Sequence, residues 1–552
     1  MKKYINKLVV LVVILAVVSC DNLDRFPLDN PSSKTFFSNQ LEMETAVNRL
    51  YTSIFFEKDN ERWGDNEWNR SLNGNTFLAG TNTSQTFDFS NGWSNSYTAV
   101  NRANVILENI DNPKDYKAGV RNRIEGEAKF TRAYNYALLA IRFKDVPLIT
   151  KTISTDEALN VVQSPQAEVL DFVFKDLDDA IGLLPESYSG VQRITKGAAL
   201  ALKARIALYT KRYAEAAAAA KQIMDAKKYA LYPSYRDLFL AAGQTSKEIV
   251  FSLPRSLTFA VTYNIQYDIS RLTGGYASNI PMISLVDSFE CTDGLTIDKS
   301  PLYNVAKPFD NRDPRLRASL VVPGDPWLGY VYNSRPSATQ TIRLSDNKLI
   351  SNQDSPSVNT FPSYTGLLKK KGIPNDPAIN WKSQDLDYVL IRYAEVLLTY
   401  AEAKIELNEI DQTVLDAINA VRARAYGVAI GNTSGYPALT TTNQSELRRY
   451  LRRERRVEFC FEGLRYRDIL RWGIANEVFN KSLYGYPKTE TAGWPIGGTP
   501  TFDANDIPNY SAFASNLNVI YTTFFDPEKH YLWAIPYGEF TINNTLKQNP
   551  KY

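Results

Sequence analysis

Histidine is almost absent from this chain of 552 residues, which contains one, His530. A metal site built from several histidines is therefore excluded, and a nucleophilic triad would have a single candidate for its histidine base. Cysteine is nearly as rare, with Cys20, Cys291 and Cys460. Cys291 and Cys460 could pair in an oxidising compartment, but two residues far apart in sequence are no disulfide framework. Because Cys460 lies in an apolar helical stretch, we expect it to be a buried free thiol.

An excess of charge is missing as well. The chain has 63 Lys and Arg against 60 Asp and Glu, a formal net charge of +3, so the whole molecule is not an electrostatic binder of nucleic acid. Long apolar runs are absent beyond the N-terminus. There, the basic start at Lys2, Lys3 and Lys7 precedes an apolar run at 8–18, which has the length of a signal-peptide core and is too short to span a bilayer.

The apolar run ends in Val17-Val18-Ser19-Cys20, which resembles the signal of bacterial lipoproteins. The sequence therefore predicts a signal peptide at 1–19 and a lipidated Cys20 as the first residue of the mature chain. Acyl chains on this cysteine would tether the protein to a membrane without a spanning helix. The alternative is an ordinary secretory signal that happens to contain a cysteine.

Helical periodicity is clearest at 387–407. Leu390, Ala394, Leu397, Ala401 and Ile405 recur at helical spacing and form one apolar stripe. Small residues on this stripe would let a second helix approach closely, and a candidate partner follows at 414–425. Such a pair of short helices cannot bury its apolar face alone, which predicts further pairs.

Similar patterns recur along the chain, so we expect mainly α structure with tetratricopeptide-like helix pairs. The scaffold is predicted mainly at 40–57, 95–250 and 385–475. Segments 58–94, 252–382 and 474–530 are rich in Gly, Pro, Asn and aromatic residues and are predicted to form a large irregular region packed on the scaffold. We expect 20–552 to form one domain.

One basic run, at 448–463, contains Glu454, Glu458 and Glu462 at intervals of four, with Arg455 three residues before Glu458. We expect these charges to pair along a scaffold helix rather than to bind nucleic acid. Carboxylate pairs such as Asp178 and Asp179 do not by themselves indicate a glycosidase, because sequence cannot place them across a cleft. No catalytic residue, cofactor or metal site is predicted, although Asn- and Asp-rich loops leave a structural calcium ion open.

Aromatic residues in loops are the candidates for ligand binding, in a chain with 33 Tyr, 26 Phe and 8 Trp. A sugar ring has an apolar face and a rim of hydroxyl groups, so its binding calls for an aromatic platform with polar side chains at the edge. For each candidate, packing within its own loop is the alternative, most of all for Trp93, which we expect to open a helix. The predicted ligand-binding residues are Trp63, Asp65, Trp68, Trp93, Asn95, Tyr276 and Trp327.

Seven segments in order carry a resemblance that covers nearly the whole chain. The first is the cysteine at 20 with the residues that follow it, and the others are 132–149, 193–209, 309–316, 387–403, 452–473 and 531–552. With these segments the chain resembles the SusD/RagB family of outer-membrane lipoproteins of the Bacteroidetes. The resemblance implies a tetratricopeptide-like scaffold with an irregular region that holds the binding site.

The same resemblance implies function. Family members lie on the cell surface, bind glycans or other nutrients and cap a TonB-dependent, SusC-like outer-membrane transporter as a lid, without enzymatic activity. We therefore expect a glycan-binding lipoprotein of the outer membrane, in contact with the membrane through its anchor only and with no nucleic-acid partner. The alternatives are a peptide-binding relative, a surface glycoside hydrolase, and a scaffold that makes only protein contacts.

Overall fold

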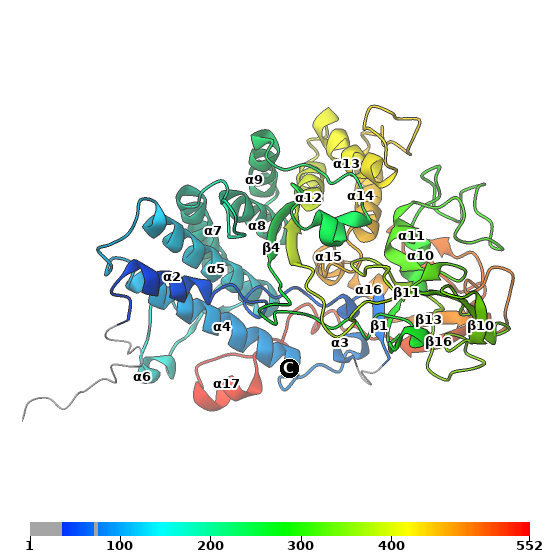
Figure 1. Ribbon diagram of the computed structural model, residues 1–552. Helices are drawn as coiled ribbons and strands as arrows, with labels where there is room; N and C mark the ends of the chain where they lie inside the picture. Colours follow the sequence, from blue (N-terminus) through cyan, green and yellow to red (C-terminus); the bar gives the residue numbers. More distant parts are fainter. Residues whose placement is uncertain (1–35, 71–74) are drawn as a thin grey trace, which may run out of the picture.

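The computed structural model describes residues 36–70 and 75–552 and is mainly helical, as the sequence predicts (Figure 1). The predicted signal peptide and Cys20 lie outside the described residues. The helices are α2 (Gln40–Asn48), α3 (Thr76–Ala79), α4 (Phe87–Glu108), α5 (Val120–Phe143), α6 (Thr155–Ala158), α7 (Gln166–Leu183), α8 (Lys196–Tyr209), α9 (Tyr213–Ala226), α10 (Ile283–Ser288), α11 (Arg315–Ser319), α12 (Tyr393–Glu406), α13 (Gln412–Ala425), α14 (Gln444–Glu458), α15 (Arg465–Arg471), α16 (Ala475–Val478) and α17 (Tyr537–Ile542).

The scaffold is a row of helices in which each packs on the next: α4 on α5, α5 on α7, α7 on α8, α8 on α9 and α9 on α12, which also contacts α13 and α14. Alanine makes the close approach possible. Ala394, Ala401 and Ala403 of α12 are fully buried, as are Ala216 and Ala220 of α9. Small side chains at these crossings bring two helix axes close together, and the longer leucine and isoleucine side chains fill the space beside them. None of the helices in the described residues is long and apolar enough to cross a membrane.

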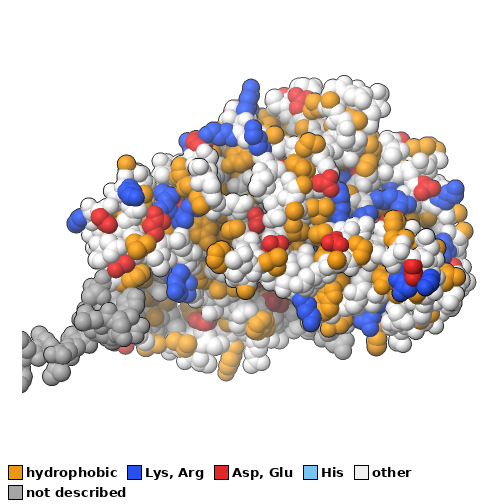
Figure 2. All heavy atoms as spheres, in the orientation of Figure 1, with side chains coloured by type: hydrophobic (Ala, Val, Ile, Leu, Met, Phe, Trp, Pro, Cys, Tyr) orange, Lys and Arg blue, Asp and Glu red, His pale blue; other side chains and the backbone are white. Residues whose placement is uncertain are grey.

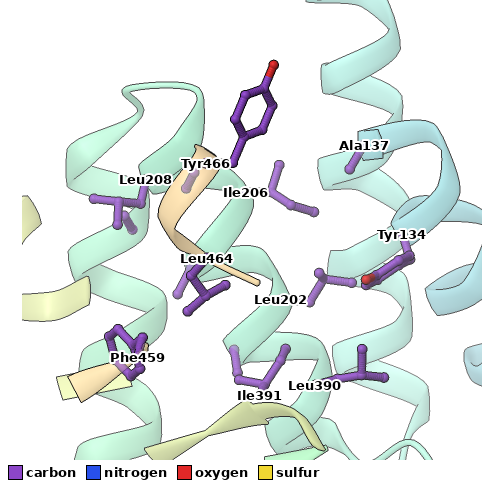
Figure 3. Close-up of a cluster of buried hydrophobic side chains, with 14 of the residues drawn as sticks. Tyr134, Ala137, Leu202, Ile206, Leu208, Leu390, Ile391, Phe459, Leu464 and Tyr466 are labelled. Atoms are coloured by element: carbon purple, nitrogen blue, oxygen red, sulfur yellow. The ribbon is translucent and has the colours of Figure 1, made fainter. Parts of the chain in front are cut away.

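The stretch 387–407 is not helical throughout, which corrects the prediction. Its first part is strand β12 (Tyr388–Arg392), which pairs antiparallel with β4 (Ile249–Leu253), and α12 begins only at Tyr393. Two β-branched residues and a tyrosine in five positions favour the strand. Leu390 and Ile391 pack beneath Tyr134, Leu202 and Ile206, which come from α5 and α8 (Figure 3).

The irregular region lies on the right of Figure 1, around α10 and α11. Its largest sheet has four short strands in the order β10-β9-β8-β7, and the remaining sheets have two strands each. The strands not yet given are β1 (Glu67–Asn69), β2 (Val146–Pro147), β3 (Gln163–Ser164), β5 (Asn279–Pro281), β6 (Leu320–Val321), β7 (Pro326–Trp327), β8 (Tyr330–Val331), β9 (Gln340–Arg343), β10 (Lys348–Ser351), β11 (Leu368–Lys369), β13 (Ser482–Pro487), β14 (Thr501–Phe502), β15 (Pro508–Asn509) and β16 (Leu517–Thr522).

The segment 58–94, predicted as long loops, is more ordered than expected. It contains β1 and α3, and α4 begins at Phe87, eight residues before the predicted helix start at Asn95. Strand β1 pairs antiparallel with β5 of the 252–382 segment, with Trp68 opposite Ile280. The first and second irregular segments are therefore joined directly by a sheet.

Helix α14 carries the basic run, and its charges do not pair along the helix as predicted. Arg453 to Arg456 are all buried, and their partners lie on other elements. A buried charge is tolerated only when it is paired and hydrogen-bonded, so these pairs fix how the scaffold and the irregular region meet. The pairs are Arg453 with Glu290 and Asp506, Glu454 with Arg315 and Arg422, Arg455 with Asp468 and Glu402, Arg456 with Asp65, and Glu458 with Arg392, Arg424 and Arg315.

Both described cysteines are buried free thiols, as predicted for Cys460. Burial raises the pKa of Cys460, because a thiolate would be poorly solvated there. The Cys460 thiol donates to Ser319 Oγ at 3.5 Å, and it belongs to a core cluster that also contains Val286, Leu316 and Val457.

Candidate ligand-binding surface

Trp63 is buried in the scaffold core and does not present a ring face to solvent. Its indole lies 4.3 Å from the Phe77 ring, nearly parallel, and meets Tyr466 and Trp533 edge to face. Only 5% of its surface is exposed. The prediction of Trp63 as a sugar platform is corrected by this packing, since four aromatic rings together bury more apolar surface than any one could in its own loop.

Asp65 is also buried and fully paired. Its carboxylate oxygens lie 2.7 Å from Arg465 Nε and 2.8 Å from Arg456 Nη2. Burial alone would raise the pKa of Asp65, but the two guanidinium groups outweigh this and hold it well below its usual range. With both oxygens engaged, Asp65 joins β1 to α14 and α15 and is not free to accept a hydrogen bond from a ligand.

Trp93 and Trp327 are buried in two other places. Trp93 lies inside α4 rather than at its start and packs against Tyr97 and Phe143, while Asn95 is partly exposed on the same helix. Trp327 of β7 is 2% exposed, and the Arg236 guanidinium and the Lys370 ammonium each lie 5.8 Å from its ring. Neither tryptophan offers a free face for stacking.

Tyr276 differs from these residues because it is exposed. Its ring lies 5.4 Å from that of Tyr267 in an edge-to-face arrangement, and the two side chains are 40% and 42% exposed. The loop that carries them folds back on itself. The Tyr276 amide donates to the Gln266 carbonyl at 2.7 Å, and the Ser278 amide donates to the Tyr267 carbonyl at 2.9 Å.

Two glycines before Tyr276 are required by this fold of the loop. A Cβ on Gly275 would lie 2.2 Å from the Ile269 carbonyl oxygen, and Gly274 has a φ of +83°, which favours glycine. A Cβ on Gly274 would lie 3.5 Å from the Trp381 indole nitrogen. Trp381, which is partly exposed, therefore lies directly beside the loop.

Arg70 connects Tyr276 to a second exposed aromatic, Phe361. Its guanidinium donates to the Tyr276 carbonyl at 2.5 Å, to the Phe361 carbonyl at 3.0 Å and to the Pro362 carbonyl at 2.6 Å. It also lies over the rings of Phe361 and Tyr364, at 5.4 Å and 5.2 Å from their centroids. Burial lowers the pKa of Arg70 from its ordinary value, and the nearby charge of Arg271 adds to this effect.

Trp68 packs against Tyr364 on the side away from Arg70. Its ring is nearly parallel to Tyr364, with centroids 6.2 Å apart, and it is 8% exposed. The rings of Trp68 and Tyr364 and the Arg70 guanidinium thus form a column whose outer end is Arg70. Of the predicted binding residues, Trp68 belongs to the support of this surface and Tyr276 to the surface itself.

We call this region the aromatic surface and define it by Arg70, Tyr267, Tyr276, Phe361 and Trp381. Of these five residues, the sequence predicts only Tyr276 as a binding residue. Tyr267, Phe361 and Trp381 could have been found by the same criterion, an aromatic residue among Asn, Gly, Pro and Ser in a loop. Arg70 carried no such signal, because its importance depends on segments more than 200 residues away.

A cavity of about 240 Å³ lies behind the same loop, where the irregular region meets the scaffold. The loop contributes Tyr263 and Asp268 to its wall, Lys58 lies at the start of the first irregular segment, and the scaffold contributes Tyr388. The Lys58 ammonium lies 4.5 Å from the Tyr388 ring centroid and donates to the Val389 carbonyl at 3.0 Å. Burial lowers its pKa to about 8. The wall of this cavity combines charged and aromatic side chains, as the aromatic surface does.

A metal ion finds no cluster of ligands among the described residues. Residues 36–70 and 75–552 contain no group of three or more His, Cys, Asp or Glu that could hold a metal ion. The carboxyl groups with strongly raised pKa values are buried: burial raises the pKa of Asp287 and of Asp354 to about 6 and that of Glu67 to about 7. What the aromatic surface can do is bind: ring faces and edges meet apolar C–H groups, and guanidinium and backbone groups meet polar ones.

A helix-pair scaffold with an irregular region packed on it, and a solvent-facing aromatic surface on that region, define the class of protein: a binding protein of the tetratricopeptide-like type. The SusD family model matches residues 247–552, and a model described as "Starch-binding associating with outer membrane" matches residues 30–208. The chain belongs to the SusD family of carbohydrate-binding proteins.

Individual relatives are similar to this chain over most or all of its length. SusD-like protein P2 of Formosa agariphila is 27% identical over 100% of both chains. A SusD-like carbohydrate binding protein from Bacteroides fragilis superposes with a TM-score of 0.79 at 28% identity, covering 93% of this chain and 100% of its own. A laminarin binding SusD-like protein shares the fold at 19% identity, with a TM-score of 0.60 and coverage of 93% of this chain and 100% of its own.

Proposed function

We propose that this protein is a cell-surface glycan-binding lipoprotein that captures oligosaccharide or polysaccharide on the aromatic surface. The observation that carries the proposal is the pair of exposed tyrosines, Tyr267 and Tyr276, next to the Arg70 guanidinium and Phe361. Membership of the SusD family and similarity to a carbohydrate binding protein from Bacteroides fragilis support the same class of ligand.

Binding would combine several weak contacts. A pyranose ring has axial C–H groups that can lie on a tyrosine ring, and its hydroxyl groups can accept from a guanidinium or donate to the loop carbonyls. Each aromatic contact contributes about 0.5 to 1.5 kcal/mol. A ligand that covers Tyr267, Tyr276 and Phe361 would therefore bind through the sum of these contacts. Because each contact is weak, the ligand could still dissociate.

Isothermal titration against a panel of polysaccharides and peptides tests this proposal. For the ligand that binds, Tyr276→Ala and Tyr267→Ala should each weaken affinity by about fivefold to tenfold, the equivalent of one aromatic contact. Tyr537→Ala is the matched control, since Tyr537 is an exposed tyrosine on α17, 56% accessible. Equal weakening by all three substitutions, or by none, would remove the aromatic surface as the site. Binding of peptides alone would replace the glycan by a peptide.

The proposed role is capture and delivery rather than chemistry. We propose a TonB-dependent, SusC-like outer-membrane transporter as partner, with this protein as its lid, anchored by a lipid on Cys20. Co-purification of such a transporter from detergent-solubilised outer membranes tests the partnership. Mass spectrometry of the N-terminal peptide tests the anchor, and Cys20→Ser should release the protein from the membrane. Release of reducing sugar from any panel polysaccharide by the purified protein would contradict the non-enzymatic role.

A further inference from the structure

Arg392 of the scaffold and two arginines at the aromatic surface, Arg70 and Arg271, are compensated differently. In the scaffold, Arg392 is paired with Glu248, Glu458 and Glu462. Arg70 of the aromatic surface and Arg271, which lies beside it on the loop between Tyr267 and Tyr276, have no carboxylate oxygen of the described residues within the 4.0 Å of an ion pair. The described residues therefore leave two positive charges there without an ion pair.

Carbonyl oxygens hold Arg70 in place without cancelling its charge. Three of its N–H groups donate to the carbonyls of Tyr276, Phe361 and Pro362, so two of the five N–H groups of the guanidinium have no partner among the described residues. The side chain is partly exposed. A planar guanidinium with free N–H groups fits carboxylate and sulfate oxygens better than it fits a neutral hydroxyl group.

Arg271 lies on the same loop as Tyr267 and Tyr276, and the guanidinium groups of Arg271 and Arg70 donate to the carbonyls of two consecutive residues, Gly275 and Tyr276. With the described residues the Arg271 side chain makes one hydrogen bond, from Nη1 to the Gly275 carbonyl at 3.3 Å. Two like charges side by side are unfavourable unless a counter-charge joins them. An anion between Arg70 and Arg271 would supply it.

Two carboxylates that contact this loop, Asp354 and Asp268, are buried. Asp354 is 1% exposed and accepts from Ser270 Oγ and from the Arg271 amide. Asp268 is 7% exposed, accepts from the Asn279 side chain and lies 3.7 Å from Lys369 Nζ. Asp268 is held by its own partners. Asp354 interacts with the charge of Arg271 but makes no ion pair with its guanidinium group.

The charge excess is local. The whole chain has a net charge of +3, and over the face drawn in Figure 2, Lys and Arg side chains are interspersed with Asp and Glu. Non-specific attraction of a polyanion to the whole molecule would therefore be weak.

We infer that the glycan bound by this surface is acidic, carrying uronate carboxylates or sulfate esters that face Arg70 and Arg271 while its rings lie on the exposed aromatics. This inference rests on the proposed function, because it names the class of glycan for the same surface. Carboxylate and sulfate share the chemistry that matters, a compact anion with several acceptor oxygens, and binding experiments separate the two.

Titration of the full chain with matched polysaccharides tests the inference. Polygalacturonate and alginate carry carboxylates, carrageenan carries sulfates, and carboxyl-reduced polygalacturonate, agarose and starch are neutral probes. We expect at least one acidic polysaccharide to bind at least tenfold more tightly than its neutral counterpart. The affinity should fall when NaCl is raised from about 50 to about 200 mM, because salt screens charge pairs at a partly exposed site.

Substitution distinguishes the charges from the rings. Arg271→Gln should weaken acidic ligands by about tenfold, the effect of one charge-assisted contact, and leave the neutral probes unchanged. Because Arg70→Gln could disturb three loop contacts, Arg271 is the primary variant. Arg343→Gln, an arginine paired with Asp346 by 2.7 Å at the β9–β10 turn, is the control and should change nothing.

The outcomes separate the two claims. Neutral polysaccharides bound as tightly as acidic ones, with a loss on Tyr276→Ala and no effect of salt or Arg271→Gln, would overturn the acidic class while the proposed function stands. No binding of any polysaccharide would overturn both. Binding confined to polygalacturonate or alginate assigns the carboxylate, and binding confined to carrageenan assigns the sulfate.

Discussion

Glu458 of α14 is the residue whose replacement most directly tests the buried charge network. It is fully buried, and its carboxylate lies 2.6 Å from Arg392 Nη1 and 2.9 Å from Arg315 Nη1, with a further bond from Arg424. Burial alone would raise the pKa of Glu458, but the guanidinium groups outweigh it and hold the pKa well below its usual range. Glu458→Gln keeps the shape and removes the charge.

The expected loss of stability depends on which carboxylates the three arginines keep after Glu458→Gln. Arg392 keeps Glu248 and Glu462, Arg424 keeps Glu248, and Arg315 keeps Asp313 and Glu454, so no guanidinium is left without a carboxylate. All three nevertheless lose one counter-charge in a dry site. Breaking a buried pair typically costs about 3 to 5 kcal/mol, and we expect Glu458→Gln to lower the free energy of unfolding at pH 7 by about 3 kcal/mol.

Urea denaturation followed by circular dichroism measures this cost. The control is Glu409→Gln, since Glu409 is 56% exposed and paired with Lys404 at 2.7 Å, and an exposed pair contributes less than about 1 kcal/mol. If Glu458→Gln is no more destabilising than Glu409→Gln, the idea that α14 fixes the scaffold against the irregular region through its charges is refuted.

Other substitutions test the packing and titration of single sites. Asp287 accepts from the Tyr510 hydroxyl at 2.7 Å, and burial raises its pKa to about 6. Because its folded pKa lies above its unfolded value, its contribution to stability is lost as pH rises from about 4 to about 6, and urea titrations should show Asp287→Asn about 3 kcal/mol more stable than the parent at pH 8 and little different near pH 4. A Cβ at Gly493 would lie 1.8 Å from the Val305 carbonyl oxygen, so Gly493→Ala should lower the urea midpoint, and an unchanged midpoint would show that this contact relaxes freely. Gly182 of α7 has open space around its Cβ position, so Gly182→Ala should raise the free energy of unfolding by about 0.5 to 1 kcal/mol, and a decrease would contradict the helical placement.

The sequence alone determined the positions of several helices and the family, because both depend on local patterns. The spacing of Ala, Leu and Val in the segments that became α7, α8, α9 and α13 depends only on neighbours three and four positions away, so their helical state was predictable. The resemblance of seven ordered segments identified the family for the same reason, since each segment is a local pattern.

Tertiary structure decided every feature that depends on distant partners. Residues 388–392 became a strand because β4 offered its edge, and the charges of α14 found partners on other elements instead of one turn away. Trp63 was drawn into the core by Phe77 and Trp533, whereas Tyr276 stayed exposed. Whether an aromatic side chain in a loop is buried depends on which distant segments fold over it. The periodicity of the sequence does not contain this information. The composition could indicate that aromatic residues bind the ligand, but only the fold brought Arg70, Tyr276 and Phe361 together.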